Sequence, residues 1–345
     1  MEISTAPRVV VVTGVSRFLG AHIAAQIAAD PQVERVIGMD RVDPPDSYRE
    51  LLDRVELRRV DLTRGGGNTL AKLGAEAVVH LAVMSSPDQA TGGGRPAMKE
   101  QNVIGTMHLL AACQQTPTLK RLVMRSSTAA YGASFRDPAV FTEDTEAREV
   151  PRGGYARDIL DIEGYVRGFR RRRPGVTATV LRFAPFVGPT AETVLLRYFA
   201  QPLVATVFGR DPRLQFIHID DALEILRRSV VEDHPGTFNV AGPGVITLSQ
   251  ALRRAGRVSL PLLEPMLQAA TWLGGVSLDQ VELFVHGRVV DTSKLRKEFG
   301  FVPRSTRVAF DDFIKSHQEG TVVTPERVDS FMRMIRGVRL GRESR

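Results

Sequence analysis

The chain has 345 residues and a mass of 37.9 kDa, which corresponds to about two lobes of roughly 150 residues each. Hydrophobic residues make up 43% and charged residues 25% of the sequence, so the collagen-like, disordered and disulfide-rich classes are excluded. The formal net charge of +7 suits anionic ligands, but it does not choose between a small molecule, nucleic acid and a membrane surface.

In chain order, the first 190 residues alternate short β-branched segments with helical patterns. Six strands are predicted, at Val9–Val12, Arg35–Met39, Val55–Val60, Ala77–Leu81, Leu122–Met124 and Thr177–Leu181. Helices are predicted at Leu19–Ala29, Val103–Cys113 and Ile159–Phe169. This alternation predicts an α/β fold, a doubly wound parallel Rossmann sheet whose ligands bind at the carboxyl ends of its strands.

The order of elements is less regular after Pro189. Helices at Val194–Phe199 and Pro261–Leu273 are predicted outside the sheet, whereas Phe216–Ile219 and Phe238–Val240 are predicted as strands that return to it. We therefore expect a dinucleotide-binding domain over residues 1–189, with returning segments near 214–242 and 285–293. A smaller carboxy-terminal substrate-binding lobe is expected over residues 190–213 and 243–330, followed by a basic tail over 331–345.

A glycine turn between the first strand and the first helix predicts a dinucleotide site. The turn runs from Gly14 to Gly20 and contains Arg17, Phe18 and Leu19. Gly14 permits the tight turn, and Gly20 permits close packing of the helix. A strand, a turn and a helix amino terminus together present backbone N–H groups and a positive dipole end to a pyrophosphate.

The second predicted strand ends in Asp40, whose carboxylate bears on the choice of cofactor. A carboxylate there can accept both hydroxyls of an adenosine ribose and would repel a 2′-phosphate, which favours NAD. Arg17 and Arg41 are nearby cations that favour NADP, so NADP is kept as the less favoured alternative. Asp40 can also be read as a turn residue before Pro44 and Pro45.

Several later motifs occur in the order of one known family. They are Asp61-Leu62, His80-Leu81-Ala82, Asn102-Val-Ile-Gly105-Thr106, Ser126-Ser127-Thr128-Ala-Ala-Tyr131-Gly132, Leu181-Arg182, Gly188-Pro189, His218-Ile-Asp220-Asp221, Phe238-Asn239-Val240-Ala241-Gly242 and Asp291-Thr-Ser293-Lys294-Leu295. With the glycine turn, they resemble the extended short-chain dehydrogenase/reductases of the NAD-dependent epimerase/dehydratase family. The resemblance covers nearly all of the chain.

The resemblance implies roles for particular residues. It places Asp61 and Leu62 at the adenine, Leu81 and Ala82 beneath the cofactor, and Asn102 and Pro185 in the cofactor site. It also implies that Ser127 orients a substrate hydroxyl. Tyr155 would then exchange the hydroxyl proton while a hydride moves to or from the nicotinamide.

The resemblance also implies partners. The substrate would be a small molecule, either a nucleotide sugar or a more hydrophobic alcohol or ketone. Relatives commonly form homodimers through a four-helix interface, to which Val103–Cys113 and Ile159–Phe169 would contribute here.

The family's lysine, four residues after the tyrosine, is replaced by Ile159, which offers neither charge nor hydrogen bond. An unassisted tyrosine with a pKa of about 10 is ionised in about one molecule in a thousand at pH 7, a handicap of roughly 4 kcal/mol if the phenolate is required. Two interpretations stay open. The chain is an NAD(P)-dependent oxidoreductase with an incomplete motif, or it is a catalytically weakened NAD(H)-binding sensor or small-ligand-binding protein. In the second, Tyr155 belongs to an apolar stripe with Ile159, Ile162 and Val166.

Further departures concern the ligands. Arg17 replaces the family's middle glycine, Pro185 replaces an Asn of many sugar-nucleotide members, and Leu214 stands where an Arg often meets substrate phosphate. A nucleotide-sugar substrate is therefore not assured.

Other ligands and the compartment are predicted from what the sequence lacks. The seven histidines show no metal-ligand spacing, so no metal is expected, and no nucleic acid partner is expected either. The amino terminus has no targeting pattern and Cys113 has no partner for an internal disulfide, which together favour the cytoplasm. Peripheral contact with anionic lipid through the basic tail is a minor alternative.

Overall fold

The computed structural model describes residues 6–64, 67–86, 93–151, 153–190, 193, 198–199, 201, 203–263, 266 and 278–316. The predicted basic tail and most of the predicted helix Val194–Phe199 lie outside these residues. Within the described ranges, no helix combines the length and the apolar character that crossing a membrane requires.

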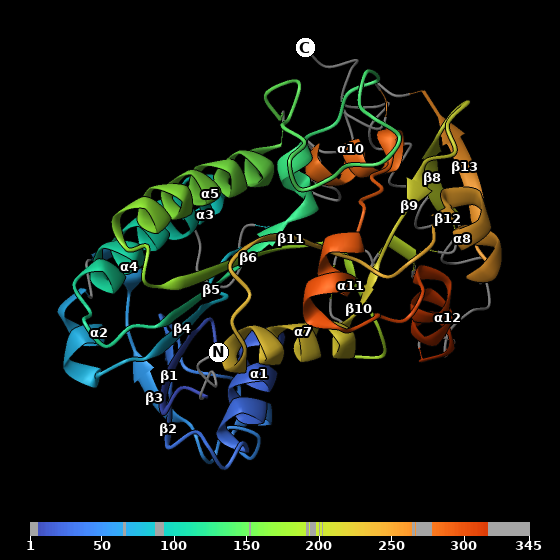
Figure 1. Ribbon diagram of the computed structural model, residues 1–345. Helices are drawn as coiled ribbons and strands as arrows, with labels where there is room; N and C mark the ends of the chain where they lie inside the picture. The colour runs from blue at the N-terminus through green and yellow to red at the C-terminus, as the bar shows by residue number, and fades with distance from the viewer. Residues whose placement is uncertain are drawn as a thin grey trace, which may run out of the picture.

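A seven-stranded parallel sheet forms the first lobe (Figure 1). Its strands are β1 (Val9–Thr13), β2 (Arg35–Asp40), β3 (Glu56–Arg59), β4 (Ala77–His80), β5 (Arg121–Ser127), β6 (Thr177–Phe183) and β11 (Gly236–Val240). Their spatial order is β11-β6-β5-β4-β1-β2-β3, with Val12 of β1 beside Val79 of β4. The predicted doubly wound sheet is confirmed. Because the strand order reverses between β1 and β4, ligands are expected at the carboxyl ends of these two strands.

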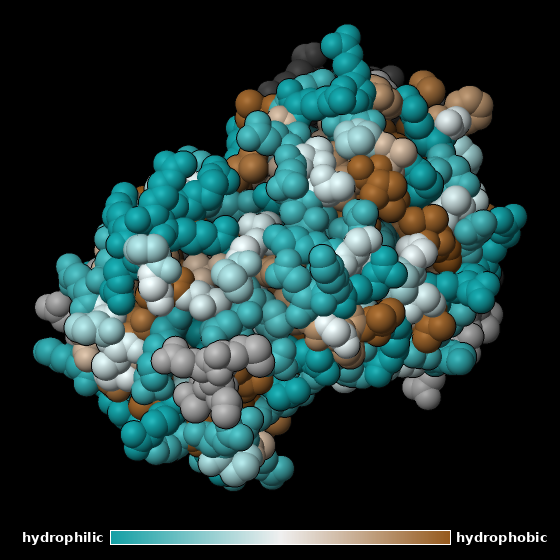
Figure 2. Space-filling view, in the orientation of Figure 1, coloured by the Kyte–Doolittle hydropathy of each residue, from teal (hydrophilic) through white to brown (hydrophobic). Residues whose placement is uncertain are grey.

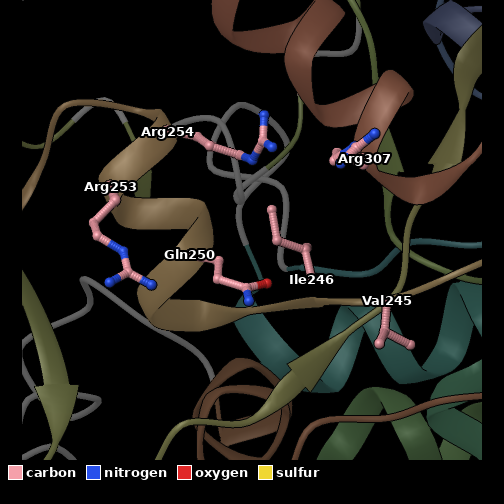
Figure 3. Close-up of a pocket in the computed structure, with 6 residues that line it drawn as sticks. All are labelled: Val245, Ile246, Gln250, Arg253, Arg254 and Arg307. Atoms are coloured by element: carbon pink, nitrogen blue, oxygen red, sulfur yellow. The ribbon is translucent and has the colours of Figure 1, made fainter.

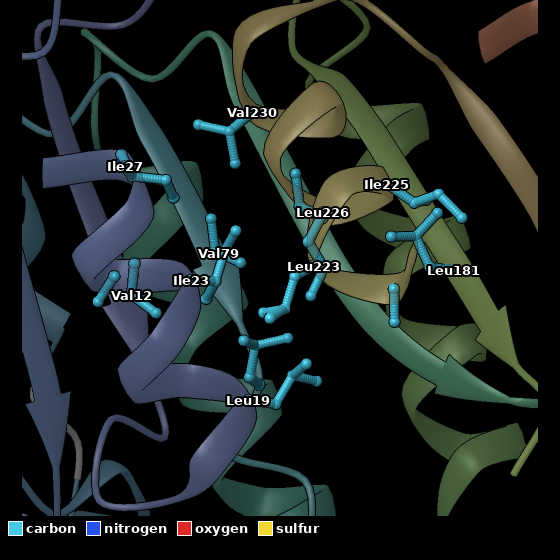
Figure 4. Packing of buried hydrophobic residues seen from close by; sticks show 14 of the residues in the cluster. Val12, Leu19, Ile23, Ile27, Val79, Leu181, Leu223, Ile225, Leu226 and Val230 are labelled. Atoms are coloured by element: carbon cyan, nitrogen blue, oxygen red, sulfur yellow. The ribbon is translucent and has the colours of Figure 1, made fainter. Parts of the chain in front are cut away.

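Helices cover both faces of the sheet, which is why β1 consists of four consecutive valines before Thr13. One face carries α1 (Phe18–Ala28), α7 (Ile219–Val231) and α11 (Ser293–Phe299). Figure 4 shows Ile23 of α1 and Leu223 of α7 converging over Val79 of the sheet. The other face carries α2 (Gly67–Leu73), α4 (Gly105–Gln114) and α5 (Gly154–Arg172).

Two of these helices begin earlier than the sequence predicts. The segment predicted from Val103 begins at α3 (Gly94–Lys99) and continues through a π-helical turn (Glu100–Ile104) into α4. Helix α5 begins at Gly154, five residues before the predicted start at Ile159. The sequence does not indicate the first turn, because the polar Arg157 and Asp158 interrupt the apolar pattern there. Cys113 of α4 is fully buried, and burial raises the pKa of its thiol to about 12.

The second lobe packs its own apolar core from short elements. They are β8 (Leu203–Val207) with β13 (Val258–Leu262), β9 (Arg213–Leu214) with β12 (Ile246–Thr247), and the helices α8 (Leu248–Arg254), α10 (Leu278–His286) and α12 (Thr306–Ser316). Phe208, Val258 and Leu263 of this lobe are exposed. Figure 2 shows the main brown patches of this face over the second lobe.

Two predicted elements need correction. The helix predicted over Pro261–Leu273 is wrong at its start, because Pro261 and Leu262 lie in β13; Met266 is helical, and residues 264–265 and 267–273 lie outside the described ones. Strand β13 pairs with β8 alone in the described residues, so the proline's missing N–H leaves no gap between two neighbours. The segment Phe216–Ile219 does not return to the large sheet. Its residues Ile217–His218 form β10, which pairs with β7 (Phe186–Val187), and Ile219 already begins α7. By contrast, Phe238–Val240 returns as part of β11.

Candidate active site

The turn between β1 and α1 leaves no space for side chains at its two glycines. Gly14 has a φ of +85°, and a Cβ there would lie 2.9 Å from the backbone nitrogen of Ala82. A Cβ on Gly20 would lie 2.1 Å from the carbonyl oxygen of Gly14. The turn therefore packs directly on the backbone that follows β4, where Leu81 and Ala82 lie. Only glycine fits both positions without a backbone shift.

Helix α1 begins with donors that no side chain caps. Its N-cap residue Arg17 has extended backbone angles, and no acidic residue lies in the first turn. The first N–H groups of a helix have no partner within it and carry a positive dipole end. Phe18 stacks on His22 at 3.8 Å, and Leu19 packs into the core. This helix end is therefore suited to an anion such as a pyrophosphate.

Asp40 lies at the end of β2 and is held against the glycine turn. Its Oδ2 accepts hydrogen bonds from the backbone nitrogen and the hydroxyl of Ser16, at 3.0 and 2.6 Å. Its Oδ1 accepts one from the backbone nitrogen of Arg41, at 2.7 Å. A carboxylate accepts about four hydrogen bonds, so Asp40 keeps capacity for a ligand hydroxyl.

The two residues predicted at the adenine follow β3. Asp61 accepts hydrogen bonds from the backbone and hydroxyl of Thr63, at 3.0 and 2.7 Å. The Leu62 side chain is buried against α4, and its carbonyl oxygen bonds to the His108 ring. A ligand there would therefore meet the backbone of Leu62 rather than its side chain.

A buried histidine joins the ends of β1 and β4 to α4. His80 Nε2 lies 2.8 Å from the Thr106 hydroxyl, which itself donates to the carbonyl oxygen of Asn102. That hydroxyl must accept from His80, so Nε2 carries the proton and Nδ1 accepts from the Thr13 hydroxyl at 2.8 Å. Burial lowers the pKa of His80 to about 3. The neutral ring therefore ties the ends of β1 and β4 to α4.

Asn102 and its neighbours hold the start of α5. The Asn102 side chain bonds to both backbone groups of Met84 and donates to Asp158 at 2.9 Å. Asp158 is fully buried and accepts two hydrogen bonds from Arg95 of α3, at 2.7 and 2.5 Å. Arg95 also donates to the carbonyl oxygen of Gly154. These contacts fix the first turn of α5, which carries Tyr155.

The predicted catalytic residues come from β5 and α5. Ser127 ends β5, and its hydroxyl accepts a hydrogen bond from the backbone nitrogen of Ala129 at 3.1 Å. Tyr155 is 8% exposed and Ile159 is fully buried in the same apolar cluster. Ile162 and Val166 belong to that cluster too, so the predicted apolar stripe is present. Pro185 follows β6, and its carbonyl oxygen accepts from Ile217.

A buried ionic network fixes the middle of α5 to the sheet. Arg182 of β6 makes two hydrogen bonds to Glu163, at 2.9 and 2.6 Å, and Ser126 of β5 donates to the same carboxylate. Arg182 also donates to the Tyr131 hydroxyl, which bonds to Asn239 of β11. Burial raises the pKa of Tyr131. The network therefore sets the position of α5 relative to three strands.

The sequence did not predict a role for one charged side chain near the carboxyl end of β5. Arg125 lies on β5, two residues before Ser127, and donates from Nη1 to the carbonyl oxygen of Val83 at 3.1 Å. Its Nε is buried and has no hydrogen-bond partner among the described residues. A buried donor left unpaired costs about 1–3 kcal/mol. The signal was a lone arginine directly after the apolar run Leu122–Met124.

The hollows found elsewhere do not mark this site. One pocket has a volume of about 490 Å³. Its lining includes Gln250, Arg253 and Arg254 of α8 and Arg307 of α12, which Figure 3 shows as sticks. It belongs to the second lobe, and Arg254 already pairs with Asp311. Across the described ranges, no three metal-ligating side chains cluster together.

Comparisons with known proteins bear on the family and the fold of the chain. Residues 10–241 match the model of the NAD dependent epimerase/dehydratase family. An uncharacterized protein of Mycobacterium tuberculosis is 40% identical over 333 residues, which span 94% of this chain and 88% of that protein.

Two solved structures share the fold at low sequence identity. UDP-glucose 4-epimerase of Thermotoga maritima with UDP-glucose has a TM-score of 0.71 and 17% identity, covering 90% of this chain and 99% of that one. dTDP-glucose 4,6-dehydratase of Bacillus anthracis in complex with NAD has a TM-score of 0.69 and 14% identity, covering 90% and 97%.

Proposed function

This chain belongs to the NAD-dependent epimerase/dehydratase family, and from that membership we propose that it is an NAD-dependent oxidoreductase acting on a hydroxyl or keto substrate by hydride transfer. One observation carries the proposal. The glycine turn, Asp40, Ser127 and Tyr155 all belong to the carboxyl ends of neighbouring parallel strands or to the helix beside them. Ligands of such sheets bind at that edge.

The residues at this edge fit NAD. The uncapped, acid-free start of α1 suits the pyrophosphate, and the close packing of Gly14 on Ala82 lets the ligand approach the backbone. Asp40 has capacity for a ribose hydroxyl, and its charge disfavours a 2′-phosphate. NAD is therefore favoured over NADP.

The proposed chemistry assigns a proton to Tyr155. Bound NAD supplies the acceptor for a hydride. When a substrate alcohol is oxidised, its C–H bond breaks and the electron pair leaves with the hydride. The hydroxyl proton passes to the phenolate oxygen of Tyr155, which becomes the neutral phenol, and a carbonyl forms on the substrate. Ser127 hydrogen-bonds the same substrate oxygen and orients it. In the reverse direction, Tyr155 returns the proton.

Two substrate classes are retained, nucleotide sugars and more hydrophobic alcohols or ketones. The first is supported by the UDP-glucose bound in the structurally similar epimerase and by the nucleotide sugar in the name of the dehydratase. The second is supported by Leu214, which is fully buried in the core of the second lobe and offers no contact to a phosphate. Its neighbour Arg213 donates to the carbonyl oxygen of Ala139 at 3.0 Å.

The test begins with binding. Calorimetric titrations with NAD, NADH, NADP and NADPH should show the tightest binding for NAD or NADH. Nucleotide sugars and hydrophobic alcohols or ketones are then screened for a change in NADH absorbance. Tyr155→Phe should abolish that change, whereas Tyr165→Phe, an exposed tyrosine of the same helix, should not. Equal turnover in the parent and Tyr155→Phe would contradict the proton-transfer role.

A second candidate function is supported by Ile159. Its side chain is fully buried among apolar neighbours, so it brings no polar group to Tyr155. A catalytically weakened protein that senses NAD(H) or holds a small ligand fits this feature. This second function predicts cofactor binding without turnover of any substrate class. The calorimetric titrations and the NADH absorbance screen therefore decide between the two functions.

A further inference from the structure

A pocket of the second lobe gathers three arginines and no acid. Its lining consists of Val245, Ile246, Gln250, Arg253, Arg254 and Arg307. Arg253 and Arg254 end α8, whereas Arg307 belongs to the first turn of α12, so two helices contribute the cations (Figure 3). All three arginines are exposed. The lining of this arginine pocket therefore carries a formal charge of +3 that a dissolved ligand can reach.

The acids beside the arginine pocket leave most of its donors unused. Arg254 donates from Nη1 to both oxygens of Asp311, at 2.7 and 2.9 Å. A guanidinium has five N–H donors, so this pairing fixes the side chain while Nε and Nη2 stay available. Asp211 lies within electrostatic range of Arg253, but its carboxylate accepts hydrogen bonds from the backbone and hydroxyl of Ser249, at 2.8 and 2.7 Å. The Arg253 side chain forms no hydrogen bond or ion pair with a described residue.

The position of Arg307 is not explained by its own helix. Arg253 and Arg254 lie in the last turn of α8, where the helix dipole favours cations without any ligand. Arg307 lies in the first turn of α12, where the dipole disfavours a cation, and no acid of that turn offsets it. Its side chain forms no hydrogen bond or ion pair within the described part of the chain. An anion in the arginine pocket would give Arg307 the partner that these residues do not supply.

A second pocket of the same volume, about 490 Å³, has a balanced charge. Its lining holds two acids, Asp220 and Asp312, and two cations, Arg304 and Lys315. Burial lowers the pKa of its histidine, His218, which is neutral at pH 7. Arg304 already donates to Asp220 at 3.1 Å. Helix α12 lines both pockets, so the excess of positive charge is particular to the arginine pocket and not general to this helix.

We propose that the arginine pocket binds a diphosphate group, carried either by free pyrophosphate or by a nucleoside diphosphate. Guanidiniums bind phosphate oxygens through paired N–H donors, and three of them match the several negative charges of a diphosphate. The volume of the pocket lies within the range of small-molecule sites. The Gln250 carboxamide oxygen accepts from the backbone of Thr247 at 3.2 Å, which leaves its NH₂ group for the ligand. The site belongs to the second lobe and does not depend on the proposed function.

Calorimetric titration of the full chain with inorganic pyrophosphate and with ADP tests the site. Arg307→Gln and Arg253→Gln should each weaken binding about tenfold, because each removes a charge-assisted hydrogen bond to the phosphate oxygens and breaks no ion pair of the described residues. Lys315→Gln removes the same charge from the other end of α12 and should bind as the parent does. The start of α1 also suits an anion, so the difference between variants identifies the pocket. Tighter binding of ADP than of pyrophosphate would identify the nucleoside diphosphate as the carrier, and the reverse would identify free pyrophosphate.

Three results would overturn the inference. They are no pyrophosphate binding in the parent, equal affinity of the parent and of both glutamine variants, and equal affinity of the parent for pyrophosphate and sulfate, since a general positive surface would not distinguish these anions. Thermal unfolding checks that the variants are folded, and Arg307→Lys, which keeps the charge without the paired donors, should bind between the parent and Arg307→Gln. NAD titrations decide the proposed function separately, and Arg307→Gln should leave them unchanged.

Discussion

Replacing His80 with glutamine should remove a defined part of the acid sensitivity of this protein. The native ring is neutral, with a pKa lowered to about 3 by burial, whereas in the unfolded chain it titrates near 6.5. As the pH falls below about 6.5, the unfolded state binds a proton that the folded state does not. Stability contributed by neutral His80 is therefore complete above that pH and is lost progressively toward pH 3.

The magnitude follows from the difference in bound protons. Over this range the free energy of unfolding falls by about 1.4 kcal/mol for each pH unit. Between pH 7 and pH 5, the His80 contribution is therefore a loss of about 2 kcal/mol. Glutamine keeps a donor for Thr106 but does not reproduce the buried ring that joins Thr13 to Thr106, so His80→Gln should be less stable than the parent at neutral pH. Because glutamine cannot be protonated, His80→Gln should lose less free energy of unfolding on acidification.

Urea unfolding followed by far-UV circular dichroism at the two pH values measures this difference. The stability gap between the parent and His80→Gln should narrow by about 2 kcal/mol at the lower pH. Equal losses in the parent and His80→Gln would refute the assignment of a neutral buried ring.

Three other substitutions test the cofactor edge. Gly20→Ala should cost about 3 kcal/mol of stability and abolish NAD binding, because its Cβ would lie 2.1 Å from a backbone oxygen. Thermal unfolding measures the loss of stability and calorimetry the loss of binding. Gly175→Ala, whose Cβ would meet no atom within 4 Å, is the control. Asp158→Asn should cost about 1.5–3 kcal/mol in urea unfolding by weakening the hold on Arg95, whereas exposed Asp161→Asn should be near neutral. Asp40→Asn should reduce the preference for NAD over NADP about tenfold in calorimetric titrations; an unchanged ratio would remove Asp40 from cofactor choice.

The parts of the fold that the sequence predicts well are those with both faces buried. Val9–Val12 is an unbroken apolar run, Thr177–Leu181 is rich in β-branched residues, and glycines at fixed positions mark the turn after the first strand. The two-residue strands β7 and β10 are too short to show a period, and Pro261 concealed an edge strand. Their pairing depends on the tertiary structure.

The candidate site divides in the same way. Its backbone half was predictable, because parallel strands bring their carboxyl ends together. The side-chain partners were not, since Arg95 and Asp158 lie 63 residues apart and their contact exists only after folding. The ring of His80 and the donor of Arg125 likewise acquire their character from burial. The roles assigned to Ser127, Tyr155 and the cofactor residues stay predictions.

The π-helical turn at Glu100–Ile104 sets the rotation, about the helix axis, between two side chains that hydrogen-bond to residues of the site. Upstream of it Arg95 reaches Asp158, and downstream Thr106 reaches His80. An α-helix advances about 100° per residue. Deleting one residue here would restore regular α-helical winding, and either Arg95 or Thr106 would then be rotated away from its hydrogen-bond partner. The segment Glu100–Ile104 should therefore tolerate substitutions far better than insertions or deletions.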